Sequence, residues 1–164
     1  MRAAFAVALL ASAVLAACGS SANRATTTAP PSGPTPAEYI ARANPICASG
    51  RRRAPTKRIL TLIGQFPTPT AEIARLLRKT AAIVRQVRDE LTAIPKPTAD
   101  TTALTQWIAQ NGAVGDLVTK AAGQVENGDL VGAVKTQQDI SVASVDPLTF
   151  AKNYGLSACS TIGS

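Results

Sequence analysis

An unbroken apolar stripe at helical spacing runs through residues 70–94 and is the strongest constraint on the fold. Its members recur at intervals of three and four residues: Ile73, Leu76, Leu77, Thr80, Ile83, Val84, Val87, Leu91 and Ile94. This period is typical of an amphipathic α-helix that buries one face. Thr68-Pro69 marks the expected start, and Pro95 and Pro97 mark the expected end.

A first helical segment is expected before this helix. Thr35-Pro36-Ala37-Glu38 is a capping box with proline at the first helical position. The residues that follow on one face are Tyr39, Ile40, Ala43 and Cys47. Because an interior proline costs about 3 kcal/mol, we expect a kink or break near Pro45 and near Pro55. The helical pattern then resumes at Ile59, Leu62, Ile63 and Phe66, until Gly64 and Pro67 stop it.

Two more segments follow the central helix. The third is expected from about Thr101 to Glu126, with its inward residues at Leu104, Trp107, Ile108, Asn111, Val114, Val118, Ala121 and Val125. Asn127-Gly128 is its stop signal, and Asp129 is the cap of the fourth segment. That fourth segment carries, at near-helical spacing, Val131, Val134, Gln138 and Val142. Pro147 is expected to disturb it, and Ile140-Ser141-Val142 is also compatible with an extended strand.

The last turn and the overall class follow from the same signals. Phe150, Ala151 and Tyr154 form a final turn that Gly155 closes in the left-handed conformation, with Leu156 as its apolar contact. Aromatic residues make up only 4% of the chain, which disfavours a β-sandwich. Four helices with short proline and glycine connections predict an all-α, up-down four-helix bundle over residues 36–164.

The N-terminus has the features of a bacterial lipoprotein signal. Arg2 is followed by an apolar stretch too short to span a bilayer comfortably, and the stretch ends in Leu15-Ala16-Ala17-Cys18. This ending resembles the bacterial lipobox. The resemblance implies that residues 1–17 are removed and that Cys18 is acylated, which places the protein on the outer face of the cytoplasmic membrane. The alternative is an ordinary secretory signal with an incidental cysteine.

Residues 18–35 have almost nothing to bury and read as a disordered tether rich in proline and threonine. At about 3.1 Å per residue in an extended polyproline-like form, it would hold the domain up to roughly 50 Å from the membrane. Thr26 to Thr28 beside Pro30 and Pro31 also fit an O-glycosylated stretch. An unmodified spacer is the equal alternative.

Histidine is absent from the whole chain, so the commonest general base and the commonest zinc ligand are missing. No glycine-rich phosphate loop, paired carboxylates or metal-ligand cluster appears. We therefore expect no catalytic activity, no metal and no cofactor.

Basic residues are concentrated in the first half of the chain, whereas after residue 97 acidic residues outnumber them six to three. The densest cluster is Arg51, Arg52, Arg53, Lys57 and Arg58. It is a candidate site for anionic lipid or an acidic wall polymer, and nucleic acid is not an expected partner of an exported protein. A solvated helix face is the alternative. Arg75, Arg78, Lys79, Arg85 and Arg88 are candidates to extend the cluster across the central helix.

With Cys18 lipidated, Cys47 and Cys159 remain, in an oxidising compartment. A disulfide between them would join the first helix to the C-terminal tail and contribute about 4–5 kcal/mol on the chain-entropy model. Free or catalytic thiols are the alternative, although no histidine or CxxC accompanies either cysteine.

Two short motifs also carry a family resemblance. Tyr39-x-x-x-Ala43-Asn44-x-Ile46-Cys47 and Ala151-x-x-Tyr154-Gly155-Leu156-x-x-Cys159 look like the two ends of a group of small secreted or lipid-anchored proteins of high-GC actinobacteria. The resemblance implies a helical bundle closed by one disulfide and assigns no activity.

Two non-enzymatic functions are compatible with these features. We expect a monomeric envelope interaction module, because short alanine-rich helices favour tight packing. The alternative is a carrier or sensor of a small apolar ligand, with Trp107 lining a pocket and Asn111 and Gln138 as its interior polar groups. A void-free core would exclude the carrier, whereas a cavity of several hundred Å³ would favour it.

Overall fold

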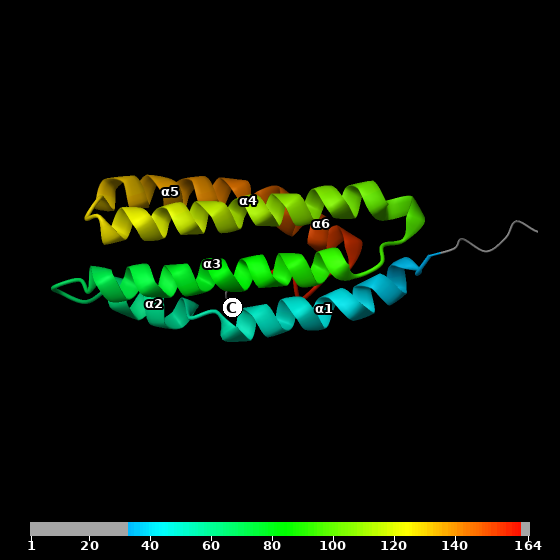
Figure 1. Ribbon diagram of the computed structural model, residues 1–164, viewed down its shortest axis with the longest axis horizontal. Helices are drawn as coiled ribbons and strands as arrows, with labels where there is room; N and C mark the ends of the chain where they lie inside the picture. The colour runs from blue at the N-terminus through cyan, green and yellow to red at the C-terminus, as the bar shows by residue number, and fades with distance from the viewer. Residues whose placement is uncertain (1–32, 162–164) are drawn as a thin grey trace, which may run out of the picture. The chain divides into compact units, whose positions relative to one another are not determined.

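The structure, a computed structural model, describes residues 33–161. The signal segment, Cys18 and most of the expected tether therefore lie outside the described residues. Within 33–161 every regular element is helical (Figure 1), and their bounds are α1 Pro36–Arg53, α2 Thr56–Ile63, α3 Thr70–Ala93, η1 Thr98–Asp100, α4 Thr101–Glu126, α5 Leu130–Ala143 and α6 Val145–Tyr154.

These elements form four rods, as predicted for an up-down bundle. α1 and α2 together make the first rod, α3 the second, α4 the third, and α5 with α6 the fourth (Figure 1). α3 packs extensively against α4, α4 packs against α5, and the first rod packs against α3. The all-α four-helix fold is thus confirmed for the described residues. None of their helices is both long and apolar enough to cross a membrane.

The helix caps follow the local sequence signals. The Thr35 side chain accepts a hydrogen bond from the Glu38 amide, and the Glu38 carboxylate accepts one from the Thr35 amide, so the capping box is complete. Asp129 caps α5 by accepting from the Gly132 amide. Gly155 ends α6 with a φ of 90°, and the amide of the fully buried Leu156 donates to the Ala151 carbonyl.

The prolines do not all act as expected. Pro55 separates α1 from α2 as predicted, but α1 continues through Pro45, so a break there is wrong. Pro45 is exposed, and water can therefore satisfy the carbonyl four residues before it, whose helical partner the proline removes. Pro147 lies in the first turn of α6, where its missing amide costs no intrahelical hydrogen bond.

The core has two clusters. The larger lies where all four rods meet and contains Tyr39, Ala43, Leu91, Ile94, Leu104, Trp107, Ile108, Ala151 and Leu156. The smaller lies near the opposite end and contains Leu62, Ile73, Ala74, Leu76 and Val125. Apart from these clusters, Gly115 of α4 lies very close to α3: a Cβ placed on it would be only 2.9 Å from Val84 Cγ1. The missing side chain therefore sets how closely α3 and α4 approach.

Cys47 and Cys159 form a disulfide with a Cα–Cα distance of 5.1 Å. It joins α1 to the tail after α6 and closes a loop between residues 112 positions apart. The pairing expected from the sequence is confirmed, and the free-thiol alternative is wrong.

The fourth rod does not bury the apolar residues that mark it in the sequence. Val131, Val134 and Val142 are 85%, 63% and 75% exposed, and Gln138 is exposed beside them. α5 instead turns Thr136 toward α4, where the Thr136 hydroxyl donates to Gln124 Oε1 at 2.8 Å and only 1% of the residue is exposed. The period predicted the helix correctly, but the inward face of this helix carries Ala133, Thr136 and Ile140 instead of the valines.

A similar difference occurs at the end of the first rod. Leu62 is buried, but Ile63 is 57% exposed and Phe66 is 99% exposed. α2 ends at Ile63, so Phe66 lies in the loop before α3, beyond the reach of the helical pattern that included it.

Candidate functional site

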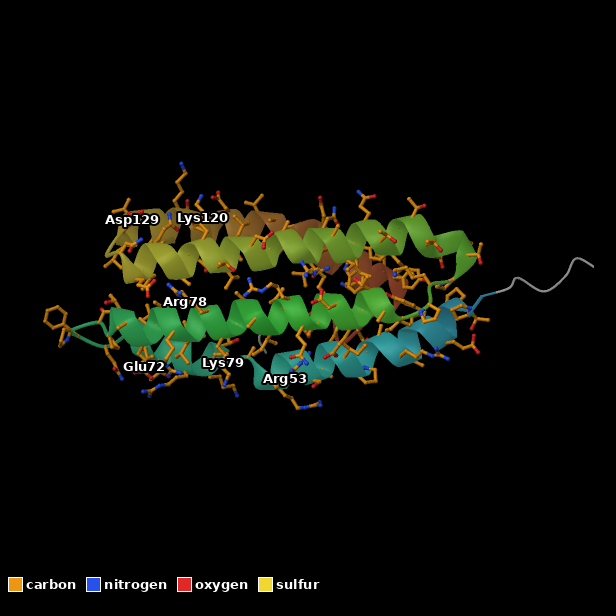
Figure 2. All side chains as sticks on the ribbon, viewed as in Figure 1. Arg53, Glu72, Arg78, Lys79, Lys120 and Asp129 are labelled. Atoms are coloured by element: carbon orange, nitrogen blue, oxygen red, sulfur yellow. A yellow bond between two sulfur atoms is a disulfide. The ribbon has the colours of Figure 1, made fainter. Side chains whose placement is uncertain are left out.

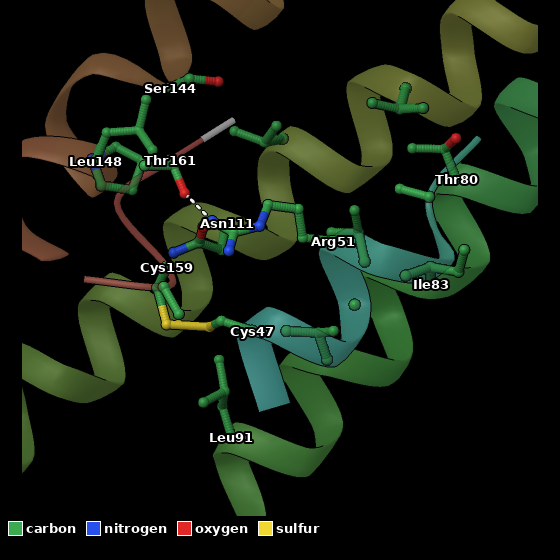
Figure 3. A pocket seen from close by; sticks show the side chains of 18 of the residues that line it. Cys47, Arg51, Thr80, Ile83, Leu91, Asn111, Ser144, Leu148, Cys159 and Thr161 are labelled. Atoms are coloured by element: carbon green, nitrogen blue, oxygen red, sulfur yellow. Dashed lines mark hydrogen bonds between the residues drawn. A yellow bond between two sulfur atoms is a disulfide. The ribbon is translucent and has the colours of Figure 1, made fainter. Parts of the chain in front are cut away.

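A partly open cavity of about 270 Å³ lies between the two core clusters. All four rods contribute to its wall, and the lining is predominantly apolar (Figure 3). α3 supplies Ile83, Val84 and Val87, and α4 supplies Val114 and Val118. The Cys47–Cys159 disulfide forms part of the wall opposite them.

The cavity lies between the contacts that join the rods. At one end Tyr39 of α1 meets Tyr154 of α6 edge to face, with ring centroids 6.4 Å apart. Toward the other end α5 packs on α4 but makes no extensive contact with α2 or α3. The inward apolar side chains of α3 and α4 in this stretch therefore face a space that no fourth helix fills.

Trp107 lies at the boundary between the larger core cluster and the cavity. It is 2% exposed, its indole Nε1 donates to the Pro147 carbonyl at 3.0 Å, and its ring stacks on Phe150 with centroids 5.9 Å apart. It also lines the cavity. The core-anchor role and the pocket-lining role predicted as alternatives are therefore both present.

The two amides predicted for the interior lie in different places. Asn111 lines the cavity, and its Nδ2 donates to the Trp107 carbonyl at 2.8 Å. Gln138 is exposed on the outer side of α5, so its assignment to the interior is wrong. Thr80, which the sequence places in the inward stripe of α3, and Ser144 also line the cavity, and their hydroxyls donate to the carbonyls of Leu76 and Ile140. Of the two, only Ser144 was missed, because it lies outside the predicted stripes.

Arg51 lies at the mouth of the cavity. It lines the cavity and also a neighbouring surface depression, whose other basic residues are Arg52, Lys57 and Arg58. Its guanidinium donates to the Thr161 hydroxyl, as the dashed line in Figure 3 shows. The turn between α1 and α2 thus brings together the basic cluster predicted from the sequence and places it beside an apolar space.

Most of this cluster lacks an acidic partner. Arg58 pairs with Glu72 at 3.1 Å, and Arg53 donates to the neutral Gln86 at 2.6 Å. Within residues 33–161 no carboxylate lies within salt-bridge distance of Arg51, Arg52 or Lys57. Arg51, Arg52 and Arg53 occupy the last turn of α1, where positive charge is favourable to the helix dipole.

The basic residues of α3 do not extend the cluster as a group. Arg78 pairs with Glu126 of α4, and Arg85 donates to Thr119 of α4. Figure 2 shows Arg78 directed toward α4, whereas Lys79 lies on the side of α2. Of the five candidates on α3, Arg78 and Arg85 therefore contact α4 and do not extend the cluster.

Burial raises the pKa values of two tyrosines at the end of the bundle where α1 meets α6. It raises the pKa of Tyr39 to about 12, and the Tyr39 hydroxyl is buried without a hydrogen-bond partner. Burial also raises the pKa of Tyr154, whose hydroxyl donates to Asp100 Oδ2 at 2.6 Å. Neither hydroxyl lines the cavity.

The described residues contain no group of three or more histidine, cysteine, aspartate or glutamate side chains that would hold a metal ion. The chemistry available in the cavity is therefore apolar contact, a few hydroxyl and amide groups, and one cation at the mouth.

Comparisons of the chain with protein-family models, with curated proteins and with solved structures found no match.

Proposed function

We propose that this protein is an exported, lipid-anchored carrier or sensor that holds a small anionic amphiphile in the cavity between its four rods. The observation that carries the proposal is an apolar cavity of about 270 Å³ with the unpaired Arg51 at its mouth. The apolar part of the ligand would lie between α3, α4 and α5, and its anionic group would contact the guanidinium.

The size of the cavity limits the ligand. Pockets for drug-sized molecules are about 300–1,000 Å³, and an apolar cavity of about 150 Å³ binds benzene. A volume of about 270 Å³ therefore suits a single short hydrocarbon chain or one small ring system. It is too small for both chains of a membrane phospholipid.

The charge at the mouth selects the polar group. A half-buried guanidinium without a carboxylate partner binds carboxylate or phosphate through charge-assisted hydrogen bonds. Arg52 and Lys57 add positive potential beside it. The Thr161 hydroxyl, its present partner, is a neutral acceptor that an anion would replace at little cost.

An envelope interaction module, the function that the sequence favours, remains the second candidate. It is supported by the same cluster, because Arg51, Arg52 and Lys57 lie together at one turn and would bind anionic headgroups at a membrane surface. The cavity supports proposing the carrier first, because the module was preferred on the expectation of tight packing. We propose binding rather than catalysis for both, because the chain contains no histidine to activate the hydroxyls in the cavity.

The test is a titration of the compact unit Pro31–Ser164, exported without lipid, with decanoate and with decanol. Trp107, the single tryptophan, reports occupancy of the cavity through its emission. We expect saturable binding of decanoate, and an approximately tenfold weaker affinity in Arg51→Gln, as for the loss of one charge-assisted contact. Decanol should bind weakly and equally to both proteins.

Two variants serve as controls. Arg75→Gln removes an exposed arginine of α3 that does not line the cavity and should leave decanoate affinity unchanged. Val114→Phe fills the cavity and should abolish binding of both probes while thermal unfolding shows that the fold remains. No saturable binding in the starting protein would contradict the carrier. Binding only to anionic vesicles, lost in Arg51→Gln, would support the second candidate instead.

A further inference from the structure

The outward face of α5 is an apolar stripe that no other described part of the chain covers. It consists of Val131, Val134, Gln138, Val142 and Val145, and the four valines are between 58% and 85% exposed. We propose that this face is a self-association surface, on which two copies of the chain pack with their α5 helices antiparallel.

The stripe is directed away from the rest of the molecule. Thr136, which faces α4, is 1% exposed, and at 100° per residue the five stripe residues centre on the opposite side of the helix. Ser144 connects α5 to α6 in a right-handed helical conformation, so Val145 continues the row beyond the end of α5. The face is therefore a continuous ridge about four turns long on one edge of the bundle.

The spacing of the stripe is symmetric about its centre. Its members are separated by three, four, four and three residues, with Gln138 in the middle. A twofold axis through Gln138 therefore places Val131 opposite Val145 of the second copy, and Val134 opposite Val142 of the second copy. Isologous contact of this kind requires a surface that matches itself after such a rotation.

The charges beside the stripe select the antiparallel direction. Lys135 and Asp139 lie on the same flank of α5, and both are exposed. In an antiparallel pair equal flanks face each other, so Lys135 comes within two positions of the level of Asp139 of the second copy, twice by symmetry. The two Asp139 side chains face each other once at the same offset, so the attractive pairs outnumber the repulsive pair two to one. In a parallel pair this flank would face the uncharged flank that carries Gln137 and Ser141. Within the described residues neither Lys135 nor Asp139 has a salt-bridge partner of its own.

The association is expected to be weak in solution. One helix face offers less area than the approximately 800 Å² per partner of a standard interface. Anchoring on one membrane would raise the effective concentration of the copies and favour the pair. We expected a monomer from the sequence, which does not show that this stripe is exposed.

The test is oxidative crosslinking of the full chain in intact cells. Gln138→Cys places a thiol on the proposed axis, where the two copies approach within disulfide reach, and Cys47 and Cys159 are already paired. We expect a covalent dimer. Val131→Cys alone should not crosslink, because antiparallel packing separates its two copies by about 21 Å along the helix. Coexpression of Val131→Cys with Val145→Cys should restore the dimer.

Charge reversal gives an independent readout. In the Gln138→Cys background, Lys135→Glu and Asp139→Lys should each reduce the crosslinked fraction several-fold, and the two together should restore it. Asp116→Cys, an exposed thiol on α4, is the matched control and should remain monomeric. A dimer from Val131→Cys alone would overturn the antiparallel packing. Absence of a Gln138→Cys dimer, or its crosslinking only to a different protein, would overturn self-association.

Discussion

The Tyr154 hydroxyl donates a hydrogen bond to Asp100 Oδ2 at 2.6 Å, across 54 positions of sequence. It ties the last turn of α6 to the turn that precedes α4, next to the fully buried Tyr39 of α1. Three of the four rods are thus joined at one end of the bundle by aromatic side chains. At the opposite end the smaller core cluster joins α2, α3 and α4 through aliphatic side chains.

Loss of the disulfide should destabilise the domain strongly. Closing a loop of this length restricts the unfolded chain, so Cys47→Ala combined with Cys159→Ala should lower the free energy of unfolding by about 4–5 kcal/mol. Urea denaturation followed by circular dichroism measures the change. The wild-type protein under reducing conditions should show the same loss, and an unchanged midpoint in both experiments would contradict the entropic role assigned to the bond.

The buried hydroxyl of Tyr39 should make Tyr39→Phe a stabilising or neutral change. The hydroxyl has no hydrogen-bond partner, and an unsatisfied buried polar group costs about 1–3 kcal/mol. We expect the free energy of unfolding to rise by about 1 kcal/mol. Tyr154→Phe is the matched comparison and should lower it by about the same amount, since it removes the bond to Asp100. A clear loss of stability in Tyr39→Phe would show that the hydroxyl has a partner, such as a buried water.

Alkaline pH should destabilise the folded protein through the buried Tyr39. The pKa of Tyr39 is raised from 10.0 to about 12, so the folded state favours the neutral phenol. Its contribution to stability is complete below pH 10 and is lost as the pH rises toward about 12. Thermal unfolding in wild type and Tyr39→Phe should diverge in this window, with the wild type falling more steeply. Parallel curves would contradict the raised pKa.

The anchor expected at Cys18 has its own test. Cys18→Ala removes the thiol proposed to accept the lipid, so the unprocessed precursor should accumulate. Immunoblotting of membrane and soluble fractions, with mass spectrometry of the N-terminus, distinguishes the precursor from the mature protein. A membrane-bound mature form in Cys18→Ala would contradict the lipoprotein proposal.

Local signals predicted the helices well. Thr35, Asp129 and Gly155 act on the backbone within four residues, so their capping roles do not depend on the rest of the fold. The stripe of α3 was also predicted correctly, since this helix has a neighbour on either side and buries most of that face.

The packing of the ends and the cavity could not be predicted from such signals. The valines of α5 have the period of a buried face, but periodicity does not say which surface covers it. Pro45 was expected to kink or break α1, but the helix continues through it, and its exposure makes the missing hydrogen bond tolerable. The cavity is lined by residues of all four rods, which lie far apart in the sequence, and only Trp107 and Asn111 were predicted as possible lining residues.

The disulfide also changes what a protease would release. Phe66 is almost fully exposed in the loop between α2 and α3, the kind of site where extracellular proteases cut first. Cys47 precedes this loop and Cys159 follows it, so the two fragments of a single cut there would remain covalently joined. Separation of the C-terminal fragment from the N-terminal one would then require reduction as well as cleavage.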